Sequence, residues 1–137
     1  MPDRALLDTG VVVALLHRDD ADHERVRPAF EAFRGTLLTT EAIVTEALFL
    51  LASIHGGQAA CLEFFIRGGA VLVPASRASL IRSKSILARY SNLPADYADA
   101  TLVALGDEME TYTIFTLDRR DFSVYRGESG QRFQLIP

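Results

Sequence analysis

Short apolar runs alternate along this chain with longer segments in which apolar residues recur every three or four positions. The short runs predict β-strands, and the longer amphipathic segments predict helices. We expect strands at residues 4–7, 36–39, 70–73, 113–117 and 133–136. We expect helices from residue 9 or 10 to about 17, and at 21–34, 41–54, 58–66, 76–90 and 95–112. Strand–helix alternation is typical of helices packed on a sheet, so we predict an α/β fold with a central, mainly parallel sheet of about five strands.

The length and composition indicate one ordinary globular domain. The chain has 137 residues, 49% of them hydrophobic, and we expect residues 1–137 to form a single domain. No apolar run approaches the roughly 20 residues of a membrane span, and the start of the chain has no secretory signal pattern. We therefore expect a cytoplasmic protein without a membrane partner. The single cysteine, Cys61, excludes an internal disulfide and a cysteine-based zinc cluster, which leaves oxygen ligands for any metal.

The charge balance argues against a protein that coats nucleic acid through bulk positive charge, because the net charge is −4. A local basic surface remains compatible with this balance. All of the basic residues except Lys84 are arginines, and arginine makes forked contacts with phosphate. The candidate phosphate contacts are Arg82, Arg119 and Arg120, although a solvated helix face explains such residues equally well.

Four acidic residues stand beside apolar segments, where an unpaired carboxylate is costly to bury. Asp8 and Asp118 each follow or end a predicted strand, and ligands of open parallel sheets bind beyond the carboxyl ends of strands. Glu46 and Asp99 lie at the margins of apolar helical faces, so they can reach over the same end of the sheet. The apolar stripe beside Glu46 consists of Ile43, Ala47, Leu50, Leu51 and Ile54. A set of four carboxylates suits Mg²⁺ or Mn²⁺.

Each acid also has a simpler interpretation. Asp8 is a good N-cap for the helix that follows it, and Asp118 suits a turn or a cap. Glu46 taken alone is one more solvated residue, and Asp96 and Asp99 are acids favoured in a first helical turn. No single position is specific, whereas the order and surroundings of the four acids are.

That order resembles the PIN-domain ribonucleases, particularly the VapC toxins of bacterial and archaeal toxin–antitoxin pairs, over essentially the whole chain. Residues 5–10, Ala-Leu-Leu-Asp-Thr-Gly, resemble the family's first strand and first acid. Residues 39–46, which end in Glu46, resemble the second motif. Residues 96–102, Asp-Tyr-Ala-Asp-Ala-Thr-Leu, are similar to the third motif, and residues 116–122, Thr-Leu-Asp-Arg-Arg-Asp-Phe, are similar to the fourth.

The resemblance implies a three-layer α/β/α fold and a Mg²⁺- or Mn²⁺-dependent endoribonuclease acting on structured RNA such as tRNA. It also implies a VapB-type antitoxin and a homodimer. One ion would lie mainly on Asp8 and Asp99 and a second nearer Asp118. The site residues that it implies are the catalytic and metal-binding Asp8, Glu46, Asp99 and Asp118, and the auxiliary Thr9, Asp96, Thr116 and Asp121.

Three alternatives differ in chemistry. The segment Leu7-Asp8-Thr9-Gly10 resembles the active-site triplet of aspartic proteases, but those enzymes need two such aspartates on a β-rich fold. A degenerate PIN-like module would bind RNA or protein without catalysis. A phosphoacceptor domain would carry adjacent acids after its first strand and a lysine near its last, and Lys84 lies elsewhere.

Overall fold

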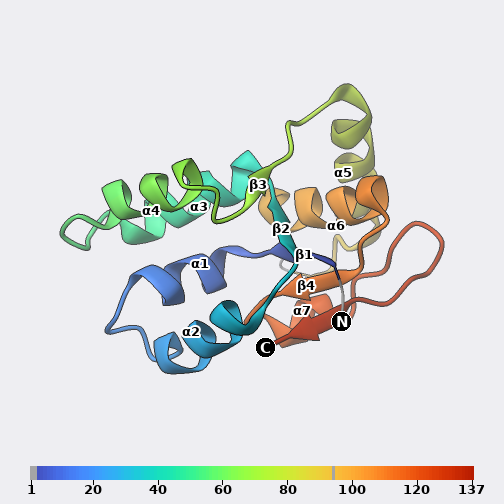
Figure 1. Cartoon of the computed structure of the whole chain (residues 1–137). Helices are drawn as coiled ribbons and strands as arrows, with labels where there is room; N and C mark the ends of the chain where they lie inside the picture. The colour runs from blue at the N-terminus through green and yellow to red at the C-terminus, as the bar shows by residue number, and fades with distance from the viewer. Residues whose placement is uncertain (1–2, 94) are drawn as a thin grey trace.

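A five-stranded parallel sheet forms the centre of the computed structural model, which describes residues 3–93 and 95–137 (Figure 1). The sheet order is β3-β2-β1-β4-β5, and every neighbouring pair is parallel. This arrangement confirms the predicted parallel sheet, although β3, β4 and β5 are shorter than expected. The strands are β1 (Arg4–Leu7), β2 (Thr36–Thr39), β3 (Val71–Leu72), β4 (Thr113–Phe115) and β5 (Gln134–Ile136).

The central strands are apolar on both faces because each face packs against helices. In β1, Ala5 and Leu7 point into one hydrophobic cluster, whereas Leu6 points into the other. Successive side chains of a strand point to opposite faces, so a strand buried on both sides has a continuous apolar sequence. In β4, Ile114 and Phe115 divide between the two clusters in the same way.

Helices cover both faces of the sheet and complete three layers. One hydrophobic cluster draws on the first four helices, and the other draws mainly on α5, α6 and α7. Figure 1 shows α5 and α6 together, apart from α1 and α2. The three-layer α/β/α prediction is confirmed. The helices are α1 (Thr9–Leu16), α2 (His23–Ala32), α3 (Glu41–Leu51), α4 (Gly57–Ile66), α5 (Arg77–Arg89), α6 (Tyr97–Met109) and α7 (Arg119–Phe122).

Some local details differ from the sequence-based expectations. The helix predicted at residues 21–34 forms as α2 and continues through Pro28 beyond its first turn, although a proline there removes one helical hydrogen bond. Pro28 is exposed, so water can reach the carbonyl that the missing N–H leaves without a helical partner. Leu50 was placed in the buried stripe of α3, but 49% of it is exposed. Of the turn or cap expected at Asp118, the cap is confirmed, because Asp118 is the N-cap of the short helix α7.

The sheet order creates a switch point between β1 and β4. The chain passes from β1 to β2 on one side, and β4 later joins β1 on the other, so the connections leave in opposite directions. Leu7 pairs with Phe115, and the Asp8 amide donates to the Phe115 carbonyl at 3.0 Å. A crevice beyond the carboxyl ends of such strands is the usual ligand site of open α/β sheets. In the part of the chain described, no helix has the length and apolar character needed to cross a membrane.

Candidate metal centre

A cavity of 430 Å³ opens at this switch point and gathers the acids singled out from the sequence. The structure brings together residues from the end of β1 and the start of α1, from α3, from the start of α6 and from the segment after β4, including the auxiliary Thr9. Thr116 does not line the cavity but is hydrogen-bonded to Asp8, which does. The acids that line the cavity are Asp8, Glu46, Asp96, Asp99, Asp118 and Asp121.

Asp8 is held by both of its carboxylate oxygens. Oδ1 accepts from the Thr9 amide at 2.8 Å, which makes Asp8 the N-cap of α1. Oδ2 accepts from the Thr116 hydroxyl at 2.7 Å, and this hydroxyl in turn accepts from the Asp118 amide at 3.0 Å. The capping interpretation is therefore correct without competing with a role in the site, because a carboxylate has further lone pairs to offer.

Asp99 is held by a residue that the sequence did not single out. Its Oδ2 accepts from the Tyr125 hydroxyl at 3.0 Å. Tyr125 is completely buried, and its ring lies edge-on to Tyr90 and to Phe122, with centroids 5.1 Å apart in each pair. A ring fixed in this way directs its hydroxyl to one point. Asp96 supports the same helix start, since its Oδ1 accepts from the Asp99 amide at 2.8 Å.

The three acids that approach most closely are Asp99, Asp118 and Asp121, which each offer a carboxylate oxygen within 4.8 Å of the others. Asp118 also caps α7, since its Oδ1 accepts from the Asp121 amide at 3.0 Å. The sequence ranked Asp121 as auxiliary, whereas the fold places it among the nearest oxygens. Such a separation allows one divalent cation to lie among the three carboxylates.

Burial and mutual repulsion raise the pKa values of the clustered acids. Burial raises the pKa of Asp99 to about 8, with further contributions from Asp8 and Asp96. Burial also raises the pKa of Asp8 to about 6, against the lowering effect of the Thr116 hydroxyl and the Thr9 amide. The pKa values of Glu46 and Asp121 rise as well, first through burial and then through Asp96 and Asp118, respectively. A bound cation would relieve this repulsion.

The hydroxyl of Thr9 supplies an independent test of whether a metal fits. Thr9 lines the cavity, and its buried Oγ1 forms no close hydrogen bond among residues 3–93 and 95–137, although the hydroxyl is near enough to Glu46 to lower the pKa of that carboxyl. Buried polar atoms are nearly always paired, so this oxygen is suited to a ligand or to a water on a ligand. Together with the carboxylates it forms an all-oxygen donor set, which is the chemistry that Mg²⁺ and Mn²⁺ prefer.

The candidate arginines divide into two groups. Arg82 lies away from the acid cavity, and its Nε donates to Asp107 at 2.9 Å in a partly buried ion pair. Arg119 and Arg120 begin α7 directly after Asp118, and both are exposed. The Nη1 of Arg119 donates to the Pro137 carbonyl at 2.9 Å. Of the three arginines, only Arg119 and Arg120 directly follow a residue that lines the cavity, Asp118.

Comparison with known proteins identifies sequence relatives over most of the chain. The sequence model of the PIN domain family matches residues 5–128. Ribonuclease VapC26 of Mycobacterium tuberculosis is 31% identical over 134 residues, which are 96% of this chain and 99% of that protein.

Two solved structures share the fold at 17% sequence identity. Mycobacterium tuberculosis VapC20, described as a toxin that cleaves the sarcin-ricin loop, has a TM-score of 0.78 and covers 85% of this chain and 91% of its own. A toxin–antitoxin complex from Klebsiella pneumoniae has a TM-score of 0.69 and covers 97% of this chain and 96% of its own. At this identity the two structures support the fold alone.

Proposed function

Since the chain belongs to the PIN domain family, we propose that it is a Mg²⁺- or Mn²⁺-dependent endoribonuclease that cleaves structured RNA such as tRNA. The observation that carries this proposal is the gathering of six carboxylates and the buried hydroxyl of Thr9 in a cavity at the sheet's switch point. The ribonuclease relative, which matches almost end to end, supports RNA as the polymer.

In the proposed site, Asp99, Asp118 and Asp121 hold the cation, and Asp8 and Glu46 complete the surrounding negative charge. A bound divalent ion would supply an activated water and charge stabilisation for phosphodiester hydrolysis. Thr116 and Tyr125 keep Asp8 and Asp99 in place through buried hydrogen bonds. The exposed Arg119 and Arg120 are proposed to contact RNA phosphates. Arg82 is proposed to stabilise the fold instead, because it forms a partly buried ion pair with Asp107.

We also propose that a VapB-type antitoxin inhibits the protein and that the chain forms a homodimer. The fold shared with a chain of a toxin–antitoxin complex, together with the similarity to ribonuclease VapC26, is the ground on which we propose this assembly. Co-expression with the small protein encoded by the neighbouring gene tests the first point, and failure to co-purify would reject it. Light scattering of the purified chain tests the second, and a mass of one chain at all concentrations would reject it.

The decisive experiment compares the wild type, Asp99→Asn and Asp19→Asn on total RNA and purified tRNA, with Mg²⁺, Mn²⁺ or EDTA. Asp19 is exposed and lies outside the cavity, so it is a matched control for loss of one carboxylate. We expect Asp99→Asn or EDTA to reduce cleavage by about 100-fold or more, because oriented charge in an active site contributes that much. Wild-type cleavage rates for Asp99→Asn would overturn the site.

The same experiment separates the alternatives. A degenerate PIN-like module would bind the RNA and leave it intact with either metal. The aspartic protease interpretation of Asp8-Thr9-Gly10 loses its structural basis, because this triplet lies between a parallel strand and a helix of an α/β fold. Such proteases pair two aspartates, whereas the neighbours of Asp8 here are acids of other motifs.

A further inference from the structure

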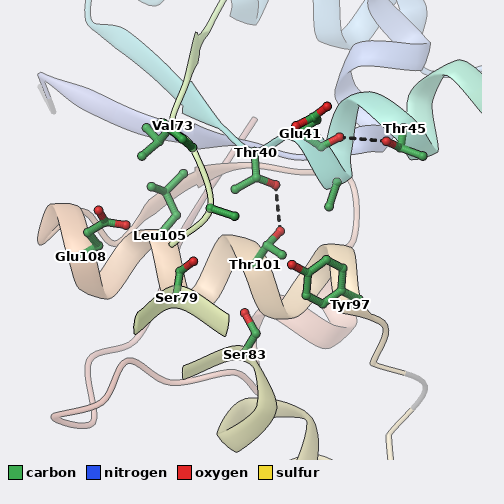
Figure 2. Close-up of a pocket in the computed structure, with 13 residues that line it drawn as sticks. Thr40, Glu41, Thr45, Val73, Ser79, Ser83, Tyr97, Thr101, Leu105 and Glu108 are labelled. Carbon is green, nitrogen blue, oxygen red and sulfur yellow. Dashed lines mark hydrogen bonds between the residues drawn. The ribbon is translucent and has the colours of Figure 1, made fainter. Parts of the chain in front are cut away.

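A second cavity, of 270 Å³, lies beyond the ends of β2 and β3, between the start of α3 and the helices α5 and α6 (Figure 2). Its α6 wall consists of Tyr97, Thr101, Leu105 and Glu108, whose spacing of three or four residues places them on one helical face. Ser83 of α5 reaches toward it from the opposite side. None of the acids that line the metal cavity lines this one, so the two cavities are distinct.

Of the six hydroxyls that line the cavity, those of Thr40, Thr45, Ser79 and Thr101 have hydrogen bonds that use their protons, and within the described part of the chain those of Ser83 and Tyr97 remain available as donors or acceptors. Thr101 donates to the Ala98 carbonyl at 2.7 Å. A hydroxyl has a single proton, and either oxygen could donate in the 2.8 Å bond that joins Thr40 and Thr101, but both bonds of Thr101 form only when Thr40 is the donor (Figure 2). Both oxygens therefore offer the cavity lone pairs only.

The same count holds for two further hydroxyls. Thr45 donates to the Glu41 carbonyl at 3.1 Å, and Ser79 donates to the Ser76 carbonyl at 2.9 Å. The side chains of Glu41 and Glu108 add two exposed carboxylates, which only accept when ionised. Among the described residues that line the cavity there is no lysine, arginine or histidine. The cavity is thus rich in acceptors and negative in charge.

A guanidinium group is the complement of such a cavity. It carries a positive charge and five N–H donors, and it has no acceptor. Its aliphatic stem would pack against the apolar wall formed by Val73, Pro74 and Leu105. An RNA base would bring acceptors of its own, and its phosphates would approach Glu41 and Glu108. We propose that this cavity binds the arginine side chain of a protein partner, independently of RNA cleavage.

NMR titration of the isotope-labelled protein with N-acetyl-arginine-N-methylamide tests the proposal. The matched ligand is the citrulline analogue, which has nearly the same shape without the charge. We expect the arginine derivative to shift the backbone amides of Thr40, Thr101 and Ser83, and to bind about tenfold more tightly than citrulline, because charge-assisted hydrogen bonds are lost. Equal binding of the two ligands at these amides, or arginine shifts confined to the metal cavity, would overturn the proposal.

Variants assign the binding to this cavity. Glu108→Gln is a surface change that preserves the fold, and we expect it to weaken arginine binding at these amides about three- to tenfold. Thr101→Val removes one acceptor and should weaken binding in the same direction. Glu24→Gln, an exposed change on α2, is the control and should have no effect. Unchanged affinity in Glu108→Gln would reject the cavity as the site.

Two further measurements separate this proposal from the others. Mn²⁺ binding and RNA cleavage by Glu108→Gln should match the wild type, so a failure of the nuclease proposal leaves this test intact. A trinucleotide titrated in place of arginine should leave the Thr40, Thr101 and Ser83 amides unshifted. If the trinucleotide shifts them and arginine does not, the cavity is an RNA subsite and the arginine proposal is wrong.

Discussion

Replacing Asp8 by asparagine is expected to stabilise the metal-free protein at neutral pH while weakening its response to metal. Asp8 is only 7% exposed, and burial raises the pKa of its carboxyl from 3.8 to about 6. At pH 7.5 the wild type must therefore keep a desolvated negative charge in the fold. Asparagine has nearly the same shape and carries no charge, so this cost disappears.

The magnitude follows from the shift in the Asp8 pKa. A difference of about 2.2 pH units between the folded and unfolded values, at roughly 1.36 kcal/mol per unit, is about 3 kcal/mol at pH 7.5. Asparagine keeps the acceptor for the Thr9 amide but presents an NH₂ group to the Thr116 hydroxyl, and losing that bond costs about 1 kcal/mol. The net gain is about 2 kcal/mol.

The sign of the pH dependence is fixed by the raised pKa. Below pH 3.8 the carboxyl is protonated in both the folded and the unfolded wild type, so its burial carries no charge penalty. The penalty grows as the pH rises and is complete above the folded pKa of about 6. At pH 4.5 the gain from asparagine is about 1 kcal/mol, which the lost hydrogen bond offsets.

Urea denaturation followed by circular dichroism in EDTA, at pH 4.5 and 7.5, measures this difference. Asp19→Asn is the control and should change the free energy of unfolding by the same small amount at both pH values. Mn²⁺ at about 100 times its dissociation constant for the wild type should then add about 2.7 kcal/mol to the wild type and less to Asp8→Asn, which keeps Asp99, Asp118 and Asp121 but loses one surrounding charge. The reasoning is refuted if Asp8→Asn destabilises the metal-free protein equally at both pH values.

Three further substitutions test the supports of the site. Tyr125→Phe removes one hydrogen bond to Asp99, so we expect about fivefold weaker Mn²⁺ binding by electron paramagnetic resonance, with little change in the urea midpoint. Arg82→Met breaks a partly buried ion pair and should lower the free energy of unfolding by about 1–3 kcal/mol in urea, with unchanged Mn²⁺ affinity by calorimetry. Thr116→Val removes the hydroxyl that lowers the pKa of Asp8, so Mn²⁺ titrations should show a greater loss of affinity at pH 6 than at pH 8.

The sheet was predictable from the sequence because its signal is local. The bounds of β1 and β2 matched the prediction, since each is a short apolar run that ends at a polar residue. The helix predicted at residues 21–34 also forms, and its continuation through Pro28 is tolerated because this residue faces solvent in the folded chain. The exposure of Leu50 was not predictable, because its environment depends on how α3 sits on the sheet.

The candidate site was predictable as far as strand ends and helical faces determine it. The grouping of Asp8 with Asp118 followed from the expectation that their strands are neighbours, which the pairing of β1 with β4 confirmed. Tyr125 gave no signal, because its contact with Asp99 joins a loop after α7 to the start of α6. The ion pair of Arg82 with Asp107 could not be predicted either, because Asp107 lies 25 residues away on another helix.

The distribution of charge explains how a chain with net charge −4 can act on a polyanion. Six carboxylates line the metal cavity, and removing those six from the 18 acidic residues leaves 12 acids against 14 basic residues, a balance of +2. The negative charge is therefore concentrated where a divalent cation would neutralise part of it, and the rest of the chain is slightly basic. RNA affinity should accordingly rise when Mg²⁺ is added and fall with increasing salt, because phosphate contacts release counterions. At pH 9, above the Asp99 pKa of about 8, Asp99→Asn should bind RNA at least as well as the wild type in EDTA, since it removes a repelling charge, and weaker binding by this variant would contradict the proposed balance.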